Sequence, residues 1–378
     1  CLGRSIESIE GLIHRDGDDV IFNGERPFQH LNDVAFPKYH RFEMDKYLTR
    51  MVPLVTSRGC PYSCIYCPVE KAIGKRFRLR NAENVVAEIE HWVDQGDSQY
   101  LILDDNFTLK TGRVEEICEL IGAKGLDELD IGLPNGVRAD RISRDLLKKM
   151  RSVGFSRLAF GVEAGNDKVL ANINKGEKMI HIESAIADAC DLGFKVTLFF
   201  IIGSPGETWA DFMDSISLAR RYPIDEARFY NLIPFPGTKL YDWVKDKGYL
   251  VRDYNEYLNS ASHFVNSPCF ETPDLSLSER KRAFKLASKT SRQVRRRSLT
   301  RKLSRLGPFA GPLAAAYTTS IVQRLSQASA PFKRLKSALN RDSDHLYQRK
   351  QENKLRNEAR GMSRESSESQ DGDRRTIV

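Results

Sequence analysis

Short apolar segments alternate six times with amphipathic helical patterns between Pro53 and Leu250. Buried strands that alternate with helices are typical of a parallel sheet covered by helices. Six such units are two fewer than a closed eightfold barrel contains. The sequence therefore predicts an α/β fold, a partial (β/α)6 TIM-like barrel of parallel strands. Strands are expected over 54–57, 100–103, 129–133, 157–162, 194–202 and 228–233, and helices over 81–95, 111–122, 143–153, 179–192, 208–221 and 239–247.

Glycine, proline and polar residues gather at the end of each predicted strand. In parallel α/β folds the carboxyl ends of the strands lie on one rim and carry the functional loops. We therefore expect these groups to form one site. They are Cys60–Cys67, Asp104–Asn106, Asn135–Arg138, Gly161–Gly165, Gly203–Glu207 and Pro234–Thr238.

The first rim loop contains three cysteines, Cys60, Cys64 and Cys67, in C-x3-C-x2-C spacing. Cysteine thiolates are the main ligands of iron–sulfur clusters. Three thiolates on a four-iron cluster leave one iron open to a small molecule. A structural zinc ion is the alternative, but such sites use four ligands in paired spacing, and no second Cys/His pair lies nearby. The other four cysteines have no partner at C-x-x-C spacing, which argues against an auxiliary cluster.

This spacing, with Tyr66 directly before the third cysteine, resembles the signature of the radical S-adenosylmethionine (radical SAM) superfamily. The resemblance covers about Pro53–Leu250 and also implies a partial barrel. It implies a 4Fe-4S cluster on the three cysteines, with S-adenosylmethionine chelated to the open iron. The implied activity is reductive cleavage of S-adenosylmethionine to a 5′-deoxyadenosyl radical, for hydrogen abstraction or radical methyl transfer on an organic substrate. An electron donor such as flavodoxin or ferredoxin would then be a partner.

The resemblance also implies contacts to the methionine part of S-adenosylmethionine. Asp104 and Asp105 occupy the place of the family segment that receives the methionine amine; a helix cap is the alternative. Glu163, in Gly161-x-Glu163-x-Gly165, resembles the fourth-strand motif that meets the ribose or the methionine moiety. An unpaired buried carboxylate is costly, which favours this role over a solvated one.

Four further residues are candidates for contacts with the cosubstrate. Gly203 and Pro205 resemble the family segment beside the adenine, where glycine lets backbone approach a flat ring. Tyr66 either contacts the adenine edge or packs as an ordinary aromatic. Arg138 is the candidate partner of the carboxylate because its planar fork suits that group, and a surface ion pair is the alternative.

The C-terminal part of the chain is strongly basic. Of the 59 Lys and Arg residues, 17 lie between Arg280 and Arg341, a stretch without Asp or Glu. The rest of the chain contains the other 42 Lys and Arg and all 51 Asp and Glu, so its formal net charge is −9. We expect a lead-in over residues 1–52, the radical SAM core over 53–250, a helical basic region over 251–345 and a disordered tail over 346–378.

The basic region is predicted to hold a helix over 275–303, followed by an apolar segment over 306–322 that is too short to cross a membrane comfortably. Attachment to an anionic membrane surface is the preferred interpretation. A helix that closes the barrel is the second, and nucleic-acid binding is the least favoured because stacking aromatics are scarce. The predicted apolar stripe of the helix is Leu277, Phe284, Leu286 and Val294.

The lead-in has a hairpin pattern before Asn23-Gly24 and an irregular connector over 31–37. In the radical SAM branch that carries a cobalamin-binding domain, a similar passage links the two domains. The chain thus resembles such a protein cut after that domain, and cobalamin would be used through a missing N-terminal domain. An ordinary extension that covers the bottom of the barrel is the alternative.

The cysteine thiolates favour a reducing compartment and hence the cytoplasm, or the inner face of the membrane if the basic region binds it. Two rival functions stay open: a cluster-binding scaffold without turnover, and an RNA-modifying radical SAM enzyme.

Overall fold

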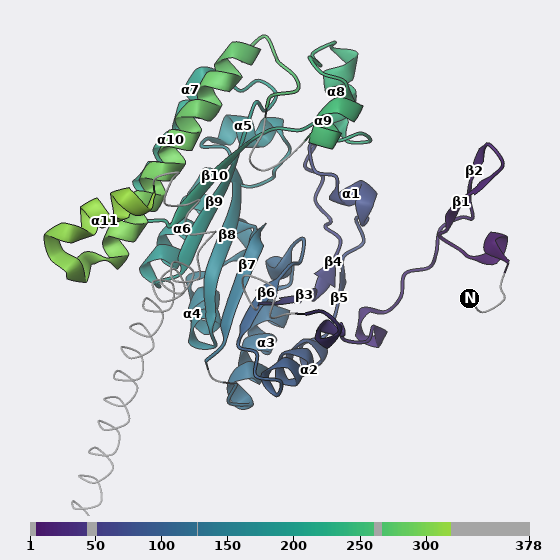
Figure 1. Ribbon diagram of the computed structural model, residues 1–378, viewed down its shortest axis with the longest axis horizontal. Coiled ribbons are helices and arrows are strands. Elements are labelled where there is room, and N and C mark those ends of the chain that lie inside the picture. Colours follow the sequence, from purple (N-terminus) through teal and green to yellow (C-terminus); the bar gives the residue numbers. More distant parts are fainter. Residues whose placement is uncertain (1–4, 44–50, 127, 261–266, 319–378) are drawn as a thin grey trace, which may run out of the picture.

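In the computed structural model, the described residues form a central sheet of six parallel strands (Figure 1). The structure describes residues 5–43, 51–126, 128–260 and 267–318. Each strand pairs with the next one along the chain, so the sheet has two free edges and does not close. The predicted α/β fold is confirmed. The strands are β3 (Val52–Leu54), β6 (Gln99–Ile102), β7 (Asp130–Val137), β8 (Phe155–Glu163), β9 (Lys195–Ile202) and β10 (Glu226–Asn231).

A helix follows each strand, and polar side chains begin several of these helices. Ser143 accepts a hydrogen bond from the backbone of Leu146, and Thr208 forms a capping box with Asp211. These caps satisfy backbone N–H groups that would otherwise lack partners. The helices are α2 (Ala82–Val93), α3 (Thr111–Ala123), α4 (Arg144–Ser152), α6 (Met179–Asp191), α7 (Trp209–Arg221) and α8 (Lys239–Asp246), with the short α5 (Asp167–Asn172) before α6.

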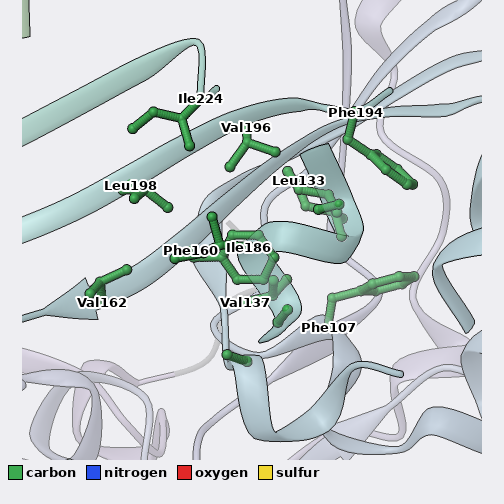
Figure 2. Packing of buried hydrophobic residues seen from close by; sticks show 14 of the residues in the cluster. Phe107, Leu133, Val137, Phe160, Val162, Ile186, Phe194, Val196, Leu198 and Ile224 are labelled. Carbon is green, nitrogen blue, oxygen red and sulfur yellow. The ribbon is translucent and has the colours of Figure 1, made fainter. Parts of the chain in front are cut away.

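The main core lies between the sheet and its helices. Along β9 every second side chain is buried, starting at Val196, and the others are half-buried on the opposite face. Figure 2 shows Val196 and Leu198 of β9 near Phe160 of β8 and Ile186 of α6, all within one buried cluster. Alternate burial follows from the period of two along a strand. The core therefore fixes which side chains reach the inner face of the sheet.

The first and third strands differ most from their predicted limits. The first parallel strand covers Val52–Leu54, and Ser57 belongs to β4 (Ser57–Arg58), which pairs antiparallel with β5 (Arg78–Leu79). Hydrogen bonds to a carboxylate hold the chain between these two strands, as described below. The third strand continues to Val137 because a register shift after Leu133 absorbs the residues in between, so 135–137 lie inside the strand instead of following it.

The C-terminal helix α10 (Leu277–Lys302) packs along β10 and α7 (Figure 1). Of the predicted apolar stripe, Val294 is buried, and Phe284 and Leu286 are half-buried against the core. The fully buried line of the helix consists mainly of small or polar side chains. Small residues allow the close approach of helix and sheet that aliphatic ones would prevent. The structure therefore supports the barrel-closing role for this helix. The buried residues of α10 are Arg280, Ala283, Ala287, Thr290, Val294 and Ser298.

The other C-terminal helices are α9 (Tyr254–Ser260) and α11 (Ala310–Tyr317). In the part of the chain that the structure describes, no helix is long and apolar enough to cross a membrane. The predicted apolar segment continues to residue 322 and the predicted disordered tail covers 346–378, so residues 319–378 of these predictions lie outside the described residues. Binding of this region to membranes or nucleic acid, and the four-part division of the chain, stay predictions.

The lead-in forms the predicted hairpin, β1 (Ile13–Asp16) and β2 (Asp19–Phe22), which lies away from the sheet in Figure 1. Both strands are largely exposed. After the hairpin, the chain runs back to the sheet, where Tyr39 donates a hydrogen bond to the carbonyl of Pro53 at 2.8 Å. The lead-in thus contacts the flank of the core near the first strand.

Replacing Ala287 by Asp should lower the free energy of unfolding by about 3 kcal/mol or more, because an unpaired charge would be buried under α10. Arg292→Asp is the control, since Arg292 is exposed on the same helix, and its effect should stay within about 0.5 kcal/mol. Chemical denaturation measures both. Equal effects would contradict the packing of α10 as a closing helix.

Candidate active site

The three-cysteine loop runs from β4 to the short helix α1 (Val69–Ala72) and is held by segments far away in sequence. The N–H of Ile65 donates to the carbonyl of Ile173 at 3.1 Å, and the N–H of Leu240 donates to the carbonyl of Ile65 at 2.9 Å. The Asn174 side chain donates to the carbonyl of Ser63 at 2.8 Å. The loop is therefore fixed by the ends of the fourth and sixth β/α units.

The end of β6 holds the beginning of the same loop. The buried Asp104 carboxylate accepts hydrogen bonds from the N–H and hydroxyl of Thr56 at 2.6 and 2.5 Å and from the hydroxyl of Ser57 at 2.6 Å. Asp105 accepts one from the N–H of Gly59 at 3.0 Å. Both carboxylates thus position the loop that carries the cysteines. Both oxygens of Asp104 accept hydrogen bonds from the beginning of this loop. Contact of either with a methionine amine stays a prediction.

Gly59 is required by this arrangement. Its φ is +87°, and a Cβ there would lie 2.5 Å from the carbonyl oxygen of Arg76. Only glycine combines this backbone conformation with such a close approach. The turn that aims Cys60 toward the rim therefore depends on the residue just before it.

A buried network of opposite charges lies next to the cysteines. The Lys175 ammonium is 2.9 Å from Glu163 Oε1 and 3.4 Å from Glu177 Oε2, and these side chains are at most 11% exposed. Arg138 donates to the carbonyl of Lys175 at 2.7 Å, pairs with Asp140 at 3.0 Å and approaches Glu177 at 3.9 Å. Buried charges need such partners. The network connects the end of β8 with the 173–178 linker and with the segment after β7.

Local backbone geometry brings Glu163 into this network. Its φ is +68°, an uncommon value for a residue other than glycine, and a register shift between Gly161 and Glu163 disturbs the pairing of β8 with β9. A Cβ on Gly161 would lie 2.7 Å from Glu163 Oε1 and 3.2 Å from Lys175 Nζ. The G-x-E sequence thus leaves room for the carboxylate to meet the lysine. Backbone strain of this kind tends to occur at functional sites.

The charged network affects the pKa of the cysteine thiols and of the neighbouring Tyr66 phenol. Burial raises the pKa of Cys64 and of Cys67, and the cation of Lys175 opposes this for both. Burial, followed by the charges of Glu163 and the two thiols, raises the pKa of Tyr66. Burial alone would lower the pKa of Lys175, but Glu163 and Glu177 more than offset it and raise that pKa. A lysine held as a cation beside thiols favours the thiolate form that binds metal.

The loop after β9 is buried beneath α10. Glu207 accepts hydrogen bonds from the N–H groups of Gly203 at 2.5 Å and Ser204 at 3.0 Å. The fully buried Arg280 of α10 lies against Gly203, where a Cβ would come within 1.9 Å of its Nη1. Burial raises the pKa of Glu207 to about 7. Pro205 lies in this loop and its carbonyl accepts from Asn172 at 2.8 Å.

The cysteine loop fits an iron–sulfur cluster better than a single metal ion. Cys60, Cys64 and Cys67 are half-buried and unbridged. Within the described ranges, no three Cys, His, Asp or Glu side chains are close enough to hold one ion. A cubane binds each thiolate at a different iron, so its ligands lie farther apart than those of one tetrahedral ion. The thiol donors and the adjacent cation therefore suit a cluster.

The structure brings most of the predicted residues into one region. Tyr66 and Glu163 interact electrostatically with the thiols, Gly161 lies against Glu163, and Asp104 and Asp105 bind the segment before the cysteines. The guanidinium of Arg138 lies 3.6 Å from the ring centroid of Tyr62, with its donors used within the protein. Its pairing with a carboxylate of S-adenosylmethionine stays a prediction. Gly203 and Pro205 lie in the buried β9 loop.

Sequence reasoning missed the residues that complete the charge network and the β9 loop. They are Lys175, Glu177 and Arg280, all buried. The first two lie in a polar linker and the third lies in a helix with many exposed basic residues, so nothing local marks them. Their burial depends on contacts with distant segments.

Comparison with known protein families identifies the domain that contains this site. Residues 54–219 match the family model of the Radical SAM superfamily. This chain carries a radical SAM domain. The matched residues include the three cysteines, the Glu163–Lys175 pair and the β9 loop, so the geometry described above belongs to that domain.

Similar proteins extend beyond the radical SAM domain itself. The chain is 32% identical over 248 residues to an uncharacterized methyltransferase of Pyrococcus horikoshii, which covers 64% of this chain and 53% of the relative. It is 26% identical over 256 residues to an anaerobic magnesium-protoporphyrin IX monomethyl ester cyclase of Cereibacter sphaeroides, with 66% and 42% covered. The chain spans about half the length of these curated relatives.

Two solved structures share the fold. The cobalamin-dependent S-adenosylmethionine radical enzyme OxsB, with aqua-cobalamin and S-adenosylmethionine bound, matches with a TM-score of 0.61 and 15% identity, over 85% of this chain and 52% of that one. The radical S-adenosylmethionine methyltransferase TsrM of Kitasatospora setae, with tryptophan and a SAM analog bound, matches with a TM-score of 0.54 and 17% identity, over 66% and 51%. At this identity the likeness concerns the fold.

Gly59→Ala should reduce the iron bound after anaerobic reconstitution and lower the free energy of unfolding by about 2 kcal/mol, because the new Cβ would collide with a carbonyl oxygen at a positive φ. Gly112→Ala in α3 is the control, since nothing lies within 4 Å of its added Cβ. Iron analysis and denaturation measure both effects. Normal iron binding by Gly59→Ala would refute the assigned role of the turn.

Glu207 should make the protein less stable as the pH rises. Its folded pKa of about 7 lies above the usual 4.5, so between these values the folded state holds a proton that the unfolded chain has released. Below pH 4.5 the protein keeps all the stability that the protonated Glu207 contributes. The free energy of unfolding falls by about 3 kcal/mol as the pH rises from 4.5 through 7. Glu207→Gln should remove that slope. Denaturation at pH 5 and pH 8 compares the two proteins, and equal slopes would exclude Glu207 as the cause.

Proposed function

We propose that this chain is the catalytic core of a radical SAM enzyme, with Cys60, Cys64 and Cys67 as the ligands of a 4Fe-4S cluster. Such a cluster supplies the electron that cleaves S-adenosylmethionine to methionine and a 5′-deoxyadenosyl radical. The observation that carries the proposal is the half-buried three-thiol loop beside the buried Glu163–Lys175 pair. The family match and the fold of OxsB support it.

The charge network supplies complementary groups for the methionine part of S-adenosylmethionine. The cation of Lys175 acts on Cys64 and Cys67 and is the proposed partner of the carboxylate. Arg138 already donates three hydrogen bonds, two to Asp140 and one to the carbonyl of Lys175. Glu163 has lone pairs left for an ammonium or ribose hydroxyl group, and Glu177 Oε2 accepts no hydrogen bond among the described residues. Together these side chains bind and orient the cosubstrate.

The loop after β9 is the proposed adenine contact. Gly203 has a φ of +96°, and two hydrogen bonds to Glu207 hold its backbone and that of Ser204 in place. Arg280 covers the loop from α10 and keeps water away from it. A rigid, dry backbone edge of this kind suits a flat base.

The step after cleavage is either hydrogen abstraction or methyl transfer on an organic substrate. The names of the relatives include a methyltransferase and a cyclase, which supports both. Methyl transfer would involve cobalamin, which OxsB binds. An electron donor such as flavodoxin or ferredoxin, and a cytoplasmic location, belong to the same proposal.

Cys64→Ala should abolish both cluster binding and the formation of 5′-deoxyadenosine, because two thiolates cannot hold a four-iron cluster in this loop. Cys190→Ala is the matched control, since Cys190 lies on α6 outside the loop and should keep both. Anaerobic reconstitution, iron analysis and chromatography of the products measure this. A wild-type protein with an intact cluster that releases no 5′-deoxyadenosine under reduction would instead be a scaffold.

A further inference from the structure

Two arginines face each other next to the cysteine loop. The antiparallel pair β4–β5 places Arg58 directly opposite Arg78. Residues opposite one another in such a pair point to the same side, and like charges there are unfavourable. Among the described residues no carboxylate pairs with either arginine, and the charge of Arg76 also acts on Arg78. The positive charge of Arg58 and Arg78 is therefore not balanced by a carboxylate in the described part of the chain.

A nearby arginine on the same segment, Arg80, has the partners that a buried arginine usually has. Arg80 is buried, forms an ion pair with Glu88 and donates to the side chain of Asn84 at 2.6 Å. Arg78 lies two residues earlier, yet its Nε is buried without a hydrogen-bond partner in the described part of the chain. Unsatisfied buried donors are uncommon in folded proteins. Four other arginines, Arg113, Arg151, Arg157 and Arg220, also have an unpaired Nε, but each donates a hydrogen bond through Nη1 or Nη2. The Arg78 side chain donates none among the described residues, so its guanidinium is open to an acceptor.

Arg58 and Arg78 line a cavity of about 660 Å³ whose opposite wall is the lead-in. Phe28 of that wall lies against Arg78, with 3.9 Å from the guanidinium carbon to the ring centroid. Phe36 and Val55 also line the cavity, and the side chains of Phe28 and Val55 are 52% and 36% exposed. Arg26 and the Arg80–Glu88 ion pair line the cavity as well. The cavity thus combines Arg58 and Arg78 with exposed apolar surface.

We propose that this cavity binds a phosphate monoester, with the phosphate on Arg58 and Arg78 and the organic group against Phe28 and Phe36. A phosphate monoester carries a charge of about −1.5 to −2 at neutral pH, which matches two arginines better than a single carboxylate does. The planar guanidinium fork suits phosphate oxygens. The site lies on the flank of the core and goes beyond the proposed cleavage of S-adenosylmethionine. Gly59 connects it directly to Cys60.

Titration calorimetry of the reconstituted full chain with phenyl phosphate at constant ionic strength tests this. We expect saturable binding that is about tenfold weaker in Arg78→Gln and in Arg58→Gln. Arg76→Gln removes the same charge from a nearby exposed residue outside the cavity and should change the affinity less than about twofold. Phe28→Ala should bring phenyl phosphate down to the affinity of inorganic phosphate. Benzoate should bind more weakly than phenyl phosphate.

Three results would overturn the proposal: no saturable binding, equal losses in Arg76→Gln and Arg78→Gln, or benzoate binding as tightly as phenyl phosphate. Arg58→Gln keeps the test valid if Arg78→Gln unfolds, because Arg58 is exposed. Release of 5′-deoxyadenosine, measured separately, distinguishes failure of this site from failure of the proposed enzyme activity.

Discussion

The candidate active site depends on the pairing of one buried lysine with two buried glutamates. Lys175 lies in a linker after α5, Glu163 ends β8, and Glu177 also accepts from the N–H of Ala139 at 2.7 Å. None of these charges could be buried alone, since each would lose its hydration without compensation. Their pairing therefore fixes three segments relative to one another. The same linker holds the cysteine loop through Ile173 and Asn174.

A second set of buried contacts places the loop from the opposite side. The end of β6 binds the segment before the cysteines through two adjacent carboxylates, Asp104 and Asp105. Backbone groups that leave a sheet need new partners, and these carboxylates supply them. Acidic residues at the end of a strand can thus serve the geometry of a metal loop without touching the metal. Arg280 of α10 likewise lies against Gly203 and helps to position the β9 loop.

The proposed phosphate site follows from the same reasoning about unpaired charge. In the buried network around Lys175, in the Arg80–Glu88 pair and beneath α10, positive side chains meet carboxylates or backbone carbonyls. Arg58 is exposed and Arg78 is half-buried, and among the described residues neither has a carboxylate partner at a cavity with aromatic walls. The proposed phosphate would supply the negative charge that carboxylates supply elsewhere in the protein.

The sequence alone determined the six β/α units, the parallel sheet and the cysteine loop, because strand and helix periodicities and ligand spacing are local properties. The caps at Ser143 and Thr208 are also local, because each needs only residues within three positions. Only the tertiary structure decided that Lys175, Glu177 and Arg280 are buried, that Glu163 adopts a positive φ, and that small residues form the inner face of α10. Those features arise where segments distant in sequence meet, and burial there reverses the usual preference of charged side chains for water.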